Sequence, residues 1–276
     1  MTRAGGIMVS LFVLVCVGVV SGRDAVPDDR SRAQALWEQA IAAKGGRERL
    51  SGIQSFALKE QSHFDTPRRP DMATGLVEQI VAALPDLWWS FEDYRPGKMG
   101  YSVAAVNTAT GQQWANYNGK PARTGRDRST GWRLRQLQYV YFLETRWVRP
   151  TPLRASRVRV GLRSVDRIET DFDGQAILFD LDVDTHLPMR IESPLKGAAP
   201  APQPGATGNT PATPAHRYIF ELSAYHDVGG IQVPGRVTLG GDAADVEVEI
   251  NPDYDPSIFT TAPPPEAGLD SWRKRR

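Results

Sequence analysis

Three aspartates at alternate positions are the first residues in this sequence that could do chemistry. Asp180, Asp182 and Asp184 would project from one face of a strand, and such carboxylates are ligands of the kind that Ca²⁺ uses. Apolar residues between them keep the segment extended, and the glycine and the final acidic residue of a calcium-binding loop are missing. We therefore expect no metal site, and a solvated acidic face that pairs across strands with Arg157, Arg159 and Arg163.

The histidines form no catalytic or metal-binding pattern. The sequence has no His-x-x-x-His or His-Glu pair, no Gly-x-Ser-x-Gly elbow and no glycine-rich phosphate loop. The four histidines are His63, His186, His216 and His226. We expect a protein that is not an enzyme and has no cofactor. A secreted hydrolase, with serine, histidine and acid brought together from distant positions, stays open as a third hypothesis.

Large aromatic residues give the sharpest indication of a binding site. Most of them are expected to fill the core, but apolar pockets are also where ligands bind. The expected cavity lining is Trp88, Trp89, Phe91, Trp114, Tyr139, Phe142 and Leu143. Arg133, Arg135 and Arg146 flank a strongly apolar segment, where they would hold a lipid head group or extend along the surface to reach water.

Composition excludes several classes of function. The 276 residues are 41% hydrophobic, enough for a sizeable core, and the net charge of +1 argues against a nucleic-acid or polybasic membrane binder. Cys16 is the single cysteine and lies in an N-terminal apolar run. Without that run the chain has no thiol, so disulfides, zinc–cysteine sites and cysteine nucleophiles are not expected.

That apolar run is typical of a secretory signal peptide. Arg3 supplies the positive start, residues 7–20 are apolar, and small residues near Gly22 suit cleavage. The run is shorter than the roughly 20 residues that a membrane-spanning helix needs. We expect a signal peptide over residues 1–22 and a periplasmic or secreted protein. Because bulky Val15 precedes Cys16, a lipid anchor there is not expected.

The remaining chain predicts a mainly β domain over residues 23–260. An amphipathic helix is expected over residues 33–41, ending at Gly45, and a helix that is apolar nearly all round over residues 130–147. Alternating strands with glycine or proline turns fill most of the rest. Residues 194–215 are rich in alanine and proline and predict a disordered insertion, and residues 261–276 predict a flexible basic tail.

Several turns resemble those of a known family. They are Ala-Lys-Gly-Gly-Arg-Glu-Arg-Leu at 43–50, Asp-Thr-His-Leu-Pro-Met-Arg at 184–190, Tyr-His-Asp-Val-Gly-Gly-Ile-Gln-Val-Pro at 225–234, and Asn-Pro at 251–252 followed by Phe259. In order and content they are similar to the LolA-like superfamily of outer-membrane lipoprotein-sorting and lipoprotein-carrier proteins. The resemblance spans residues 33–259 and rests on turn chemistry rather than on active-site residues.

The resemblance implies an incomplete antiparallel β-barrel of about eleven strands, with helices covering its concave face and a hydrophobic cavity between. Members bind acyl chains or other lipids, and relatives serve as envelope stress sensors. In the carriers, the strand after a proline turn commonly carries an arginine directed at the cavity. Here Pro85 is followed by Leu87, Trp88, Trp89 and Ser90, which argues against the carrier role itself but not against a hydrophobic ligand.

We therefore expect an exported, monomeric envelope protein that noncovalently binds a lipid or a lipidated protein in an apolar cavity. The alternative is an envelope stress sensor or protein-interaction module of the same fold that transports no lipid. Neither interpretation involves nucleic acid.

Overall fold

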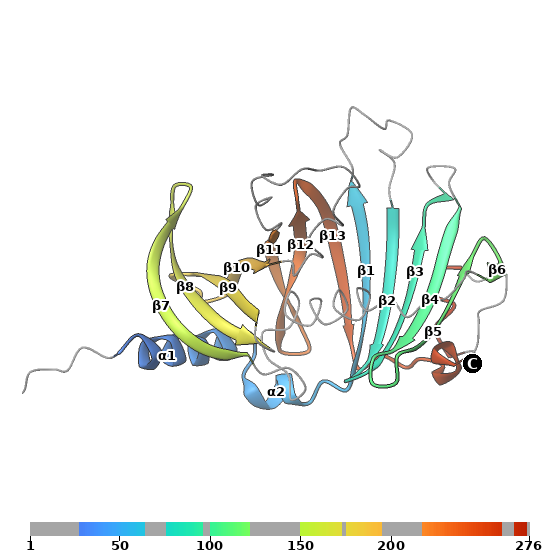
Figure 1. Ribbon diagram of the computed structural model, residues 1–276, viewed down its shortest axis with the longest axis horizontal. Coiled ribbons are helices and arrows are strands. Elements are labelled where there is room, and N and C mark those ends of the chain that lie inside the picture. The colour runs from blue at the N-terminus through green and yellow to red at the C-terminus, as the bar shows by residue number, and fades with distance from the viewer. Residues whose placement is uncertain are drawn as a thin grey trace, which may run out of the picture.

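The chain forms one open antiparallel sheet. The computed structural model of the protein describes residues 28–63, 76–95, 100–121, 150–172, 175–194, 217–260 and 268–274. Within them, thirteen strands are hydrogen-bonded in the order β6-β5-β4-β3-β2-β1-β13-β12-β11-β10-β9-β8-β7 (Figure 1). The two ends of this order, β6 and β7, are not paired with each other. In the described residues the expected antiparallel architecture is therefore confirmed as an unclosed sheet, with more strands than the resemblance implies.

The first three elements in the chain are α1 (Asp29–Ala43), α2 (Arg47–Ser51) and β1 (Ser55–His63). The strands that follow in the first half are β2 (Leu76–Ala83), β3 (Leu87–Asp93), β4 (Tyr101–Asn107), β5 (Gln112–Tyr117) and β6 (Lys120–Pro121). The second half contains β7 (Thr151–Val160), β8 (Arg163–Phe172), β9 (Gln175–Asp182), β10 (Pro188–Pro194), β11 (Arg217–Val228), β12 (Ile231–Leu239), β13 (Asp242–Ile250) and the short 3₁₀ helix η2 (Pro256–Phe259).

Helix α1 forms where the amphipathic pattern predicts it. The carboxylate of Asp28 caps it by accepting a hydrogen bond from the backbone N–H of Ser31 at 2.6 Å. The helix ends before Gly45, which adopts a φ of 125° that a glycine tolerates readily. Its buried side chains are Ala33, Trp37, Ala40 and Ile41, one stripe of the helix.

This stripe packs on one face of the sheet, called here the inner face. The main contacts of α1 are with β7 and β8, and the Trp37 ring meets Phe179 of β9 edge to face, with centroids 5.1 Å apart. Arg32 of α1 lies 3.8 Å from the buried carboxylate of Asp166 on β8, and this attraction helps to hold the helix on the sheet. The same carboxylate pairs with Arg157 of β7 at 2.9 Å.

The opposite, outer face carries a second apolar cluster. Strands β2 and β3 are buried on both faces, as their sequences predict. The outer cluster contains Ala57, Val81, Trp89, Phe91, Val103, Ala105, Phe259 and Trp272. Phe259 of this cluster comes from η2, and Trp272 comes from the segment 268–274. The end of the described chain therefore covers the outer cluster.

That arrangement corrects part of the predicted flexible tail. Trp272 is only 2% exposed, and Asp270 and Gln79 exchange hydrogen bonds of 2.8 and 3.1 Å. The segment 268–274 is held on the sheet because burying the indole ring of Trp272 removes a large apolar area from water. The predicted helix over 130–147, most of the insertion at 194–215 and the signal peptide lie outside the described residues.

Candidate functional site

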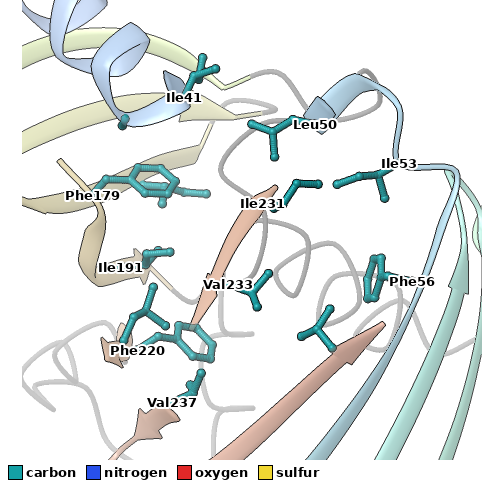
Figure 2. Packing of buried hydrophobic residues seen from close by; sticks show 14 of the residues in the cluster. Ile41, Leu50, Ile53, Phe56, Phe179, Ile191, Phe220, Ile231, Val233 and Val237 are labelled. Atoms are coloured by element: carbon teal, nitrogen blue, oxygen red, sulfur yellow. The ribbon is translucent and has the colours of Figure 1, made fainter. Parts of the chain in front are cut away.

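The candidate binding surface is the inner face of the sheet. One cross-strand row runs Ala155–Ile168–Phe179–Ile191–Phe220 from β7 to β11, each residue directly opposite the next. Directly opposed side chains in antiparallel strands lie close together and make a continuous surface. Figure 2 shows Phe179, Ile191 and Phe220 on one side and Ile53 and Phe56 on the other, directed into the same interior.

Apolar inner-face residues are also present on the strands of the first half of the chain. Leu58 of β1 lies between Val248 of β13 and Ile80 of β2. Two residues away along β1, on the same face, a second cross-strand row runs Phe56–Ala82–Trp88–Val106 from β1 to β4. The rings of Phe56 and Trp88 meet edge to face with centroids 5.8 Å apart. The apolar inner face therefore extends well beyond β7 and β8, the strands that α1 mainly contacts.

The structure divides the predicted cavity lining between the two faces. Trp88 belongs to the inner face, whereas Trp89 and Phe91 belong to the outer cluster and Trp114 packs against it. Neighbouring residues on a strand point to opposite faces, so Trp88 and Trp89 cannot line one pocket. Tyr139, Phe142 and Leu143 lie outside the described residues, as do Arg133, Arg135 and Arg146.

Both tryptophans of this pair carry an unusual polar group. The side chains of Trp88 and Trp89 are each 1% exposed, yet their indole N–H groups donate to no acceptor within the described ranges of the chain. A buried donor without an acceptor costs about 1–3 kcal/mol. On the inner face, an acceptor brought by a ligand would remove that cost at Trp88.

The predicted acidic face is organised differently from the expectation. Asp180 is buried rather than solvated, and its partner is Arg167 of β8, which donates two hydrogen bonds of 2.6 and 2.8 Å. Asp182 accepts hydrogen bonds from the backbone of Asp184 and Thr185, and the bond from Thr185 lowers the pKa of the Asp182 carboxyl. The described residues contain no cluster of three metal-binding side chains.

Two cavities of the described residues are lined mainly by outer-face side chains. One of about 280 Å³ lies beside Asp180, Arg190 and Glu221, and the other, of about 350 Å³, lies between Lys59, Glu249 and Trp272. Both contain several charged groups, so neither is the apolar pocket that the sequence predicts. Among the described helices, none combines the length and apolar character required to cross a bilayer.

No family model and no curated protein matches the chain. Among solved structures, the chain is similar to a domain of an outer membrane lipoprotein-sorting protein from Vibrio parahaemolyticus, with 10% identity and a TM-score of 0.42 over 83% of this chain and 97% of that one. It is also similar to Pseudomonas aeruginosa MucB in the MucA/MucB complex, with 13% identity and a TM-score of 0.19 over 79% and 94% of the two chains. A third similarity, to PNGF-II, has 10% identity and a TM-score of 0.26, and covers 75% of this chain and 30% of that one.

The first of these structures is a lipoprotein-sorting domain, the kind of protein that the turn motifs resemble. At these identities and TM-scores, no ligand, partner or activity is transferred to this chain.

The structure adds a polar junction that the sequence analysis did not single out as a site. Lys44, just after α1, is 1% exposed and donates from its amine to the carbonyl of Gln232, and its amine lies 5.5 Å from the centre of the Tyr225 ring. Burial lowers the pKa of Lys44 to about 7. Burial also raises the pKa of Tyr225, whose hydroxyl donates to the carbonyl of Pro188 at 2.7 Å. In the sequence, this junction was indicated only by a lysine that lies between the end of a helix and a glycine pair.

Proposed function

We propose that this is an exported envelope protein that noncovalently binds a lipid, or the acyl chain of a lipidated protein, against the inner face of its open sheet. The observation that carries the proposal is the continuity of the apolar inner face from β8 to β4, on a sheet whose edge strands do not pair. We propose that the protein acts by binding alone, without covalent chemistry.

The energetics of acyl chains suit such a surface. Each buried CH₂ group contributes about 0.8 kcal/mol, so a long acyl chain supplies on the order of 10 kcal/mol. Association and ordering cost at least about 4 kcal/mol of that, which leaves at most about 6 kcal/mol and a Kd of tens of micromolar or weaker. A carbonyl of the lipid ester or amide would in addition accept a hydrogen bond from the indole of Trp88.

A protein-interaction module of the same fold is the second candidate, and one observation favours it. The inner-face side chains are already closely packed, with Phe56, Ile168 and Phe179 fully buried. An acyl chain would enter only if these packed side chains moved apart. A protein partner could instead bind elsewhere on the molecule.

The test separates the two candidates. Native mass spectrometry of protein purified from a bacterial periplasm, followed by organic extraction, should recover a bound lipid. Delipidated protein should then bind a fatty acid that carries bromine atoms in its chain, and the bromine should quench tryptophan fluorescence. If no lipid co-purifies and the brominated acid causes no quenching, the lipid-binding proposal is wrong and the interaction module is favoured.

Trp88 and Trp89 provide a matched pair for locating the chain. They are neighbours on β3, equally buried, and on opposite faces. Quenching should fall in Trp88→Phe and persist in Trp89→Phe, because only the inner-face indole would lie beside the acyl chain. Loss of quenching in Trp89→Phe instead would place the ligand on the outer face.

A further inference from the structure

In the part of the chain that the structure describes, β7 is hydrogen-bonded to another strand on one side only. It is the last strand of the sheet and pairs only with β8. Among the described residues, no hydrogen bond from another segment reaches the backbone of residues 151–160. Figure 1 shows β7 as the outermost strand, with its hairpin end lying away from α1. Of the opposite edge strand, β6, the structure describes two residues.

The two halves of β7 differ in how well they are protected. Pro152 lacks a backbone donor, and a register shift follows it before Arg154; both features discourage pairing with another strand. From Ala155 to Val160 the register with β8 is regular and contains no proline. This second half could accept an added strand along six residues.

The charge of β7 disfavours pairing with a second copy of itself. Its ten residues include Arg154, Arg157 and Arg159 and no carboxylate. Arg154 pairs with Glu169 and Arg157 with Asp166, whereas Arg159 is exposed and has no charged partner among the described residues. Antiparallel pairing of two such strands would bring arginines near one another, which is unfavourable.

The same pattern selects a strand of complementary composition. Arg157 and Arg159 alternate with Val158 and so lie on the same side of β7 as Ala155, the inner side. Arg157 and Arg32 of α1 both face buried Asp166. Val158 and Val160 project to the other side and are only partly buried. An incoming strand would satisfy both sides if acidic and apolar residues alternate along it.

We propose that β7 is a docking site for an extended acidic–apolar segment of a partner protein, which adds as a strand to the sheet edge over Ala155–Val160. Main-chain hydrogen bonds supply the affinity in this mode of recognition, and the alternating side chains supply the specificity. This site is separate from the inner face and does not depend on lipid binding there.

The test uses the full chain and a defined probe, a fluorescently labelled peptide of alternating glutamate and valine. It should bind, and amide hydrogen exchange should slow in residues 155–160. A peptide of alternating lysine and valine should not bind. A fully N-methylated glutamate–valine peptide, which keeps its charges but has no backbone donors, should also fail to bind.

A matched pair of variants tests the protein side. Arg159→Glu should weaken peptide binding by about tenfold, since a like charge now faces the probe. Lys120→Glu, an equivalent charge reversal at the exposed residue of the opposite edge, should leave binding unchanged. Circular dichroism should show both variants folded.

Several results would overturn the proposal. They are absence of binding at about 1 mM peptide, equal binding of the N-methylated peptide, or protection away from β7. Protection of β7 that rises with protein concentration and without peptide would identify a second copy as the occupant, and this too would contradict an acidic partner.

Discussion

The backbone at Gly45 lies so close to Gly230 that a Cβ added to Gly45 would stand 2.2 Å from the Gly230 carbonyl oxygen. The neighbouring backbone of Lys44 accepts a hydrogen bond from the N–H of Gln232 at 2.9 Å. Two of the turn motifs that carry the family resemblance therefore touch each other, although about 185 residues separate them. The glycine pairs are explained by close approach of two backbones as well as by their own turns.

Gly45→Ala should destabilise the protein more than Gly46→Ala. Both positions have positive φ, but a Cβ on Gly46 meets nothing within 4 Å. The control therefore measures backbone strain alone, and Gly45→Ala adds a clash that should lower the free energy of unfolding by about 1–3 kcal/mol more. Urea unfolding measures both; equal losses would show that the contact yields without cost.

Lys44 should make stability depend on pH. Its pKa falls from 10.5 to about 7 on burial, so between those values the unfolded chain holds a proton that the folded chain lacks. The cost of burying the charge is fully present below pH 7, and stability should rise from pH 7 to 10.5 by up to about 1.4 kcal/mol per pH unit.

Lys44→Met should remove this rise and stabilise the protein at pH 6. Urea unfolding of both proteins at several pH values isolates the contribution of Lys44 from that of other groups. Parallel curves for the two proteins would mean that the Lys44 amine titrates normally in the folded state.

Trp272→Ala should uncover the outer cluster without affecting lipid binding. Trp272 is 2% exposed against Trp89 and its neighbours, and removing a buried tryptophan side chain costs about 3–5 kcal/mol. Leu269→Ala, in the same segment but 38% exposed, is the control and should change little. Binding of an apolar dye should increase only in Trp272→Ala; an unchanged thermal midpoint would show that this segment is not held on the sheet.

Asp166→Asn should loosen α1. The substitution keeps the shape of a buried side chain but removes the charge that faces Arg157 and Arg32. We expect the thermal midpoint to fall by about 2–4 °C. Asp245→Asn removes a carboxylate from an exposed pair with Arg236 and should leave the midpoint nearly unchanged, because such pairs contribute little. If both variants melt alike, Asp166 does not anchor the helix.

Local patterns predicted most of the described elements. The stripe from Ala33 to Ile41 gave α1, and the apolar residues on both faces of β2 and β3 correctly indicated strands covered on two sides. The same alternation could have separated Trp88 from Trp89, since adjacent strand residues never share a face. The buried pairing of Asp180 with Arg167 was missed because several arginines on β7 and β8 were equally plausible partners before the register was known.

The sequence by itself determined that this chain makes two-faced antiparallel strands with an apolar side, because alternation and turn chemistry act within a few residues. Only the tertiary structure decided which apolar side faces α1 and which faces Trp272. That choice depends on the pairing of β1 with β13, where Phe56 lies opposite Ile250. Contacts between residues so far apart leave no local pattern in the sequence, and they also decide that Lys44 is buried and that β7 stands at the edge.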